Sequence, residues 1–196
     1  METTLSLTNT QRLSQRLNET PAAAARREAA RSALLELSDP ISKYGLDIRS
    51  TFSFSDLAGK MAPQEEEYAL PQHEILSSGV VICDLSTAFK EFPQIMEKHF
   101  SQTLRNDDKW HMVHSVLVDR GTFVYLPSHV HASEPIILEQ SLVTRSRVES
   151  ILIFAEENAS ASILVGQQSL ASPAIPIFVS TTIEVIAKKD ARLSIA

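Results

Sequence analysis

Cysteine is nearly absent from this sequence, since Cys83 is the only one in 196 residues. A single thiol excludes an intramolecular disulfide and indicates a reducing compartment such as the cytoplasm. No apolar run approaches the roughly 18 residues that a membrane-spanning helix needs. The first residues, METTLSLTNT, lack the basic and apolar regions of a secretory signal. We therefore expect a cytoplasmic protein with no membrane partner.

Basic residues and glycines are also few. The 18 lysines and arginines are outnumbered by 24 acidic residues, and the net charge of −6 argues against a nucleic-acid partner. The five glycines form neither a phosphate-binding Gly-x-x-x-x-Gly-Lys loop nor a Gly-x-Ser-x-Gly nucleophile elbow. We expect a chain without catalytic residues that is not an enzyme, so any ATP chemistry would belong to a partner.

Residues 1–40 are typical of a helical region. Thr20 is a suitable N-cap, Pro21 suits the first helical position, and the Ala-rich run that follows ends before Pro40. Leucines gather only at the end of this run, which predicts a helical arm with little to pack against. Residues 41–78, which include the three glutamates 65–67, are typical of an exposed, variable linker.

Residues 79–196 have the β-branched and apolar composition of a β core. GVVICDL predicts a strand that buries Cys83, and STAFKEFPQIMEKHF predicts a helix capped by Ser86. Phenylalanines 89, 92 and 100 share a helical stripe with Met96. The predicted strands after residue 110 are HMVHSVLV, TFVYL, PIILEQ, ESILIFA, SASILVG, IFVSTTIEVIA and ARLSIA.

Similar turns recur between these strands. VDRGTF, AEENAS and AKKDAR place Gly121, Asn158 and Asp190 after charged residues, and all three residue types tolerate left-handed turn geometry. Short strands joined by recurrent turns suit either a stacked β-solenoid or a sandwich. The periodicity alone does not choose between them.

A histidine pair raises the question of a metal. His129 and His131 would share one face of a strand, with Glu134 close behind. A cupin-like metal barrel has a similar His-x-His element, but no second histidine motif follows here. His111 and His114 precede the pair and would contribute only if the fold returned them to it. We expect no metal ligands and two exposed histidines.

The core resembles a known family in one consistent order. The segments GVVICDLSTAFKEFPQIMEKHF, DKWHMVHSVLVDRGTFVYLPSHV, SILIFAEENASASILVG and TTIEVIAKKDARLSIA are similar to the core of the SufB/SufD proteins. The resemblance implies a mainly β fold, a partial right-handed parallel β-helix with an N-terminal helical region. It also implies a role in the SUF machinery for iron–sulfur cluster assembly, in which SufB and SufD pair around the ATPase SufC. In this family a glycine often stands at the position of His129.

One departure from the family pattern indicates the SufD branch. The SufB branch has a cysteine after the glycine that matches Gly166, whereas this chain has Gln167. The resemblance further implies a C-terminally truncated β-helix core. We expect a SufD-like scaffold subunit in a hetero-oligomer with SufB-like and SufC-like partners, binding no cofactor by itself. The alternatives are a metal-dependent cupin-like enzyme using His129 and His131, or a degenerate SufD relative that acts only as a protein-binding module.

Overall fold

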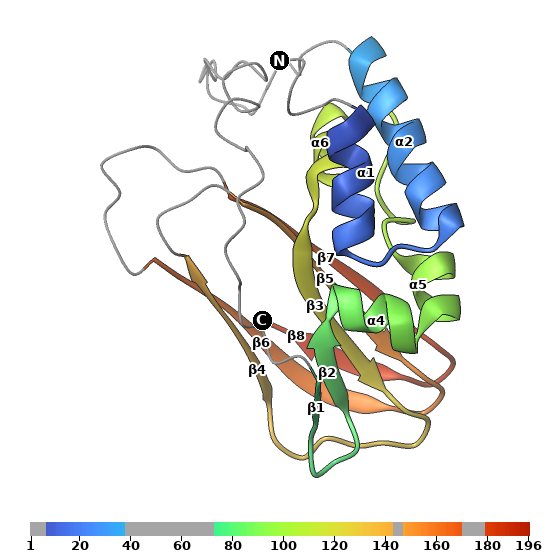
Figure 1. The fold of residues 1–196 in the computed structure, drawn as a ribbon. Helices are drawn as coiled ribbons and strands as arrows, with labels where there is room; N and C mark the ends of the chain where they lie inside the picture. Colours follow the sequence, from blue (N-terminus) through green and yellow to red (C-terminus); the bar gives the residue numbers. More distant parts are fainter. Residues whose placement is uncertain (1–6, 38–72, 143–146, 170–178) are drawn as a thin grey trace.

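The computed structural model describes residues 7–37, 73–142, 147–169 and 179–196. Figure 1 shows helices layered on one side of the strands. The helices are α1 (Leu7–Arg16), α2 (Pro21–Glu36), α4 (Leu85–Glu91), α5 (Pro93–His99) and α6 (Lys109–Leu117). The strands are β1 (His73–Ile75), β2 (Val81–Asp84), β3 (Arg120–Leu126), β4 (Ile136–Leu142), β5 (Arg147–Ala155), β6 (Ser160–Ser169), β7 (Val179–Ala187) and β8 (Arg192–Ile195).

The strands form two sheets, and from β3 onward the chain alternates between them. One sheet has the order β1-β2-β3-β5-β7, and the other has the order β4-β6-β8. All pairs among β3, β5 and β7, and among β4, β6 and β8, are parallel. The antiparallel pairs are β1 with β2 and β2 with β3. The strands predicted from residue 120 onward are thereby confirmed, and of the two arrangements left open the alternation resembles a stacked solenoid.

Two hydrophobic layers cover the larger sheet. Side chains such as Val124, Ile151 and Ile163 are fully buried between the two sheets. On the opposite face Phe123, Leu152 and Phe154 pack against the helices. The predicted stripe of Phe89, Phe92, Met96 and Phe100 packs in this second layer.

The prediction of a mainly β fold is wrong in its balance, because the described structure has mixed α/β content. Residues 111–117 of the predicted strand HMVHSVLV lie in α6 instead. The side chain of Asp108 caps this helix by accepting hydrogen bonds from the backbone N–H groups of Trp110 and His111. Met112, Val113, Val116 and Leu117 are buried at helical spacing. Burial against neighbouring helices therefore outweighs the β preference of the valines.

Helix α2 begins as predicted, but it is not a loose arm. The Thr20 side chain caps it by accepting from the Ala23 N–H group, and Pro21 is the first helical residue. Ala23 and Leu34 are buried, and α2 packs against α1 and α6. Its alanines Ala23, Ala30 and Ala33 pack in the hydrophobic layer with the other helices, so they provide a packing surface where we expected little.

Two further predictions need correction in detail. The cap of α4 is Asp84, which accepts from the Thr87 N–H group, rather than Ser86. Most of the predicted linker 41–78, including glutamates 65–67, lies outside the described residues, but within it His73–Ile75 forms β1. The longest described helix, α2, has 16 residues. None of the described helices is long and apolar enough to span a membrane.

Candidate functional site

The histidine pair singled out by the sequence lies in the connection between β3 and β4. His129 and His131 are both exposed, as predicted, and Glu134 is exposed as well. Asn158 Nδ2 donates a hydrogen bond to His129 Nδ1 over 2.9 Å. His131 Nδ1 lies 2.9 Å from Ser160 Oγ. Asn158 lies in the connection between β5 and β6 and Ser160 is the first residue of β6, so each imidazole joins its turn to the next coil.

The described residues do not form a metal centre around this pair. No three His, Cys, Asp or Glu side chains among them are grouped as metal ligands would be. His111 and His114 lie in α6, where His111 Nδ1 accepts from the Arg105 N–H group and His114 contacts β5 and β7. The fold therefore does not bring them to the pair. Its parallel strands also differ from the jelly-roll barrel of a cupin, which is antiparallel.

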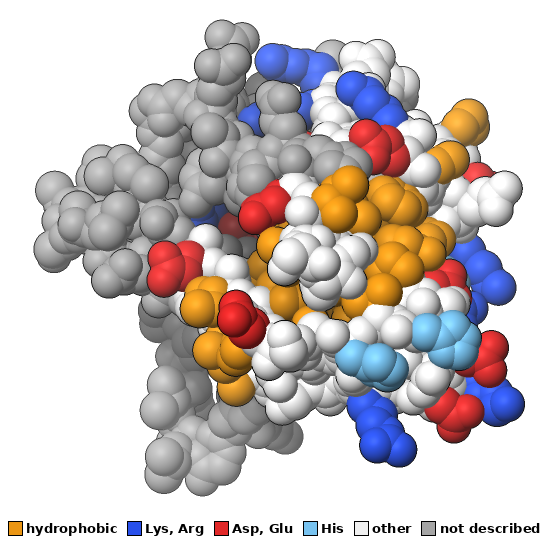
Figure 2. All heavy atoms as spheres, turned by 90° about the horizontal axis from the view of Figure 1, so that it is seen from below, with side chains coloured by type: hydrophobic (Ala, Val, Ile, Leu, Met, Phe, Trp, Pro, Cys, Tyr) orange, Lys and Arg blue, Asp and Glu red, His pale blue; other side chains and the backbone are white. Residues whose placement is uncertain are grey.

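Among the described residues, the underside of the molecule carries no concentrated charge that would suit a polyanionic partner. Figure 2 shows a central hydrophobic area there, with two imidazoles beside it and acidic and basic groups interspersed around the rim. Mixed charge of this kind is typical of an ordinary soluble surface.

The repeated turns are real, but the equivalent residues differ from those predicted. His129, Asn158 and Asp190 have φ values of 62°, 59° and 59°. The backbone N–H group of His129 donates to the Glu157 carbonyl, and that of Asn158 donates to the Lys189 carbonyl. The three turns are thus stacked, and His129 occupies the left-handed position that favours glycine.

Gly121 was wrongly placed in this series, because it lies inside β3 with φ of 153°. A Cβ atom at this position would lie 1.9 Å from the backbone oxygen of Ser150 in β5. The glycine therefore permits close approach of two strands, and it does not form a turn.

The single thiol is unreactive in this structure. Cys83 lies in β2, is 1% exposed, and packs with the hydrophobic side chains beneath the helices. Burial, with smaller contributions from the charges of Asp84 and Glu91, raises the pKa of the thiol to about 12. Cys83 therefore stays protonated near neutral pH and is poorly suited to act as a nucleophile or metal ligand.

A buried polar cluster was not predicted from the sequence. His114 of α6 is 1% exposed, and its Nδ1 lies 2.9 Å from Ser180 Oγ. Its Nε2 lies 2.8 Å from both Ser150 Oγ and Thr182 Oγ1. Ser150 and Thr182 are register partners in β5 and β7, 3.0 Å apart through their hydroxyl oxygens. One imidazole therefore ties α6 to two adjacent strands.

The chemistry of this cluster is structural rather than nucleophilic. Burial lowers the pKa of His114 to about 3, with smaller effects from His111 and Arg27, so the ring is neutral near pH 7. A Ser–His pair at this distance can form a nucleophile in an open site. Here Ser150 is fully buried, and the ring nitrogen that would face an orienting carboxylate contacts Ser180. The sequence offered only a weak signal, since His114 stands among valines.

A second buried polar contact holds α2 in place. Arg27 pairs with Glu19, and both side chains are 2% exposed. The Nη1 group of Arg27 also donates to the carbonyls of Val116 and Val118, over 2.8 Å and 2.9 Å. These carbonyls end α6, so the arginine acts as a C-terminal cap for a helix far away in sequence.

Comparison with known proteins identifies relatives for part of the chain. The family model described as the SufBD protein N-terminal region matches residues 59–138. This match begins inside the segment that we expected to be a variable linker.

Curated relatives extend the similarity at low identity. An iron–sulfur cluster assembly SufBD family protein of Staphylococcus aureus is 25% identical over 147 residues, which cover 70% of this chain and 30% of the relative. The corresponding protein of Staphylococcus haemolyticus matches to the same extent. A chloroplastic SufBD family protein of Arabidopsis thaliana is 28% identical over 92 residues, covering 45% of this chain and 16% of the relative. The chain thus spans less than a third of the length of these relatives.

Proposed function

Because this chain belongs to the SufB/SufD family, we propose that it is a SufD-like, non-enzymatic scaffold component of the machinery that assembles iron–sulfur clusters. Its partners in this proposal are a SufB-like subunit and a SufC-like ATPase in the cytoplasm. The relatives are named for iron–sulfur cluster assembly, which supports the process. The assignment to the SufD branch depends on the chain itself.

The state of the single thiol carries this assignment. Iron–sulfur clusters are held mainly by cysteine thiolates, whereas Cys83 is buried with a pKa raised to about 12. Where the SufB branch is expected to have a cysteine after Gly166, this chain has Gln167. A subunit with this thiol inventory is suited to support a cluster-bearing partner. It is poorly suited to hold the cluster alone.

The architecture supports a scaffold built as a right-handed parallel β-helix. The chain passes from β3 to β4, β5, β6, β7 and β8 in alternation between two parallel sheets. Each turn is hydrogen-bonded to the next through its backbone. Such stacked coils form an extended rigid surface, which suits a protein that positions other subunits.

Co-expression of the tagged chain with a SufB-like and a SufC-like protein from the same organism tests the proposal. We expect all three to co-purify, and anaerobic reconstitution with iron and sulfide to give cluster absorption only when the SufB-like subunit is present. The variant Cys83→Ala should leave co-purification and cluster yield unchanged, because the thiol is a core side chain.

Each part of the proposal has its own contrary result. Failure of the chain to enter the complex would contradict the scaffold role. Loss of the cluster in Cys83→Ala would contradict the SufD-like assignment. The chain purified alone should hold no transition metal. About one equivalent of metal, lost on changing His129 and His131 to Ala, would instead support the cupin-like enzyme.

A further inference from the structure

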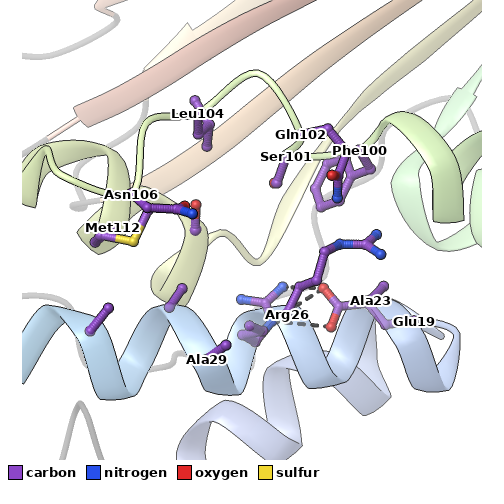
Figure 3. A pocket seen from close by; sticks show the side chains of 14 residues that line it. Glu19, Ala23, Arg26, Ala29, Phe100, Ser101, Gln102, Leu104, Asn106 and Met112 are labelled. Atoms are coloured by element: carbon purple, nitrogen blue, oxygen red, sulfur yellow. Dashed lines mark hydrogen bonds and ion pairs between the residues drawn. The ribbon is translucent and has the colours of Figure 1, made fainter.

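A hollow of about 380 Å³ lies between α2 and the loop that joins α5 to α6. Figure 3 shows Arg26 extending from α2 toward the loop that carries Phe100, Ser101 and Gln102. The volume lies at the small end of the range for ligand sites, about 300 to 1,000 Å³. A compact small molecule would fill it.

Two buried polar atoms of residues that line this hollow have no hydrogen-bond partner among the described residues. They are Nη2 of Arg26 and Oγ of Ser101. Buried donors and acceptors are nearly always paired, so each exception requires an explanation. Both of these exceptions belong to residues that line the same hollow, and they come from different elements. A ligand bound there would lie beside both side chains.

The charges around the hollow favour an anion. Glu19 also lines it, but its carboxylate is held by Arg27, so these two charges offset each other. Glu184 lies behind the loop, where it accepts hydrogen bonds from the backbone N–H groups of Ser101 and Thr103. The charge of Arg26 is therefore left facing the hollow.

The backbone fixes the position of Ser101. Its φ is 58°, and it directly follows Phe100, the C-cap of α5, where a residue in the left-handed conformation commonly ends a helix. Here the contacts with Glu184 hold the loop, so Ser101 is fixed at the wall of the hollow.

The remaining walls determine what else the ligand carries. They include the apolar side chains of Ala23, Ala30, Ala33, Phe100, Leu104 and Met112. Apolar walls with a few polar groups are typical of sites for small organic molecules. An inorganic ion alone would leave these walls in contact with water.

We propose that this hollow binds a small organic anion, whose oxyanion is held by Arg26 and Ser101 and whose apolar body lies along α2. The oxyanion is a carboxylate or a phosphate monoester, both of which arginine binds through charge-assisted hydrogen bonds. This site is separate from the scaffold function proposed above, and its test does not require any partner protein.

The test uses the full chain and ligands that share one ring. Benzoate and phenyl phosphate carry the two candidate oxyanions, and benzamide is the neutral counterpart of benzoate. Binding is followed by changes in the amide NMR signals during titration at constant ionic strength. We expect saturable changes at Ser101 and Gln102 with at least one anion. The anion that binds more tightly, benzoate or phenyl phosphate, identifies the oxyanion that the site prefers. Benzamide should bind at least about ten-fold more weakly, because it lacks the charge that Arg26 recognises.

Variants locate the site. Arg26→Gln should weaken anion binding by at least about ten-fold, and Ser101→Ala by a smaller factor. Arg192→Gln is the matched control. Arg192 is an exposed arginine on β8, away from the hollow, and its substitution changes the net charge by the same amount. Far-UV circular dichroism checks the folding of each variant. If Arg26→Gln does not fold, the anion affinity of Ser101→Ala tests the site instead. The proposal is overturned by the absence of saturable anion binding, by equal binding of benzamide, or by unchanged affinity in folded Arg26→Gln.

Discussion

Strands β5 and β7 are adjacent and parallel in the same sheet, yet their side chains differ greatly in exposure. Every residue of β5 is buried. In β7 the first four residues are only partly buried, and from Ile183 onward exposed positions alternate with the buried Glu184 and the partly buried Ile186. Ile151 of β5 is 0% exposed, and its register partner Ile183 of β7 is 42% exposed. Two isoleucines in equivalent positions thus have opposite environments.

The difference comes from the neighbours of each strand. β5 lies between β3 and β7, while in the described structure β7 has only β5 beside it. In a stack of parallel coils, a side chain becomes buried when the next coil covers it. Burial is therefore a property of position in the stack, and sequence pattern alone does not reveal it.

The largest effect should come from truncating the two isoleucines in turn. Ile151→Ala removes a fully buried side chain and should lower the free energy of unfolding by about 3 to 4 kcal/mol. Ile183→Ala, its register partner, should cost less than about 1 kcal/mol because that side chain is already partly in water. Urea denaturation of both variants measures the contrast. Equal losses would show that β7 is covered in solution.

The next largest effect should come from glycine substitution, which should change stability differently in the two sheets. Gly121→Ala would place a Cβ atom 1.9 Å from the Ser150 backbone oxygen, and the required strand displacement should cost about 3 kcal/mol. Gly166→Ala is the matched change in β6, where a Cβ atom would meet no atom within 4 Å. We expect it to be neutral or to stabilise by about 0.5 kcal/mol. Melting temperatures of the two variants provide the measurement, and a stable Gly121→Ala would contradict the close β3–β5 approach.

His114 bridges β5 and β7, so its titration should report on their joint stability. Its pKa is about 3 in the folded chain and about 6.5 when unfolded, so below pH 6.5 the unfolded state binds the extra proton. Stability should fall as pH falls from 6.5 toward 3, by about 2 kcal/mol between pH 7 and pH 5. In His114→Gln this part of the pH dependence should disappear. Denaturation at several pH values compares the two chains, and identical slopes would show that His114 is solvated.

The smallest effect should come from the stacked turns. His129 has φ of 62°, so His129→Gly should relieve left-handed strain and stabilise the chain by up to about 1 kcal/mol. His131→Gly removes a similar side chain at a position without positive φ, and it should destabilise slightly. Thermal unfolding distinguishes them. A loss of stability in both variants would show that the contact of His129 with Asn158 outweighs the strain.

The strands from residue 120 onward could be predicted because each has a clear local signal. Short apolar, β-branched segments bounded by Asn, Asp or charged residues are strong indicators of strands. The cap of α2 was equally readable, since Thr20 and Pro21 stand side by side. Local chemistry determines these elements, so a single sequence was enough.

Helix α6 could not be predicted because its stability is not local. Its sequence, KWHMVHSVL, contains valines and histidines that are poor helix formers. What favours the helix is Asp108 at its start and the surface of α2, which is some 80 residues earlier in the chain. The same dependence on distant partners concealed the contacts of His114 with Ser150, Ser180 and Thr182.

The candidate sites also differ in whether local sequence could predict them. Burial of Cys83 and exposure of His129 and His131 followed from residue type and neighbouring residues. The hollow beside Arg26 did not, because its walls come from α2 and from a loop that begins at Phe100. An arginine in an Ala-rich helix gives no sign by itself of whether it faces water or a ligand.

The bonds of Arg27 to the carbonyls of Val116 and Val118 also bear on the order of folding. These groups are separated by 89 and 91 residues, so they meet only after a long loop has closed. Helix α2 is the first long helix in the chain, yet its partner surface is completed only when α6 has formed. We expect α2 to dock late, after the strands have paired, and to undock first under mild denaturant. The N-terminal helices would then act as a latch that closes over a preformed sheet.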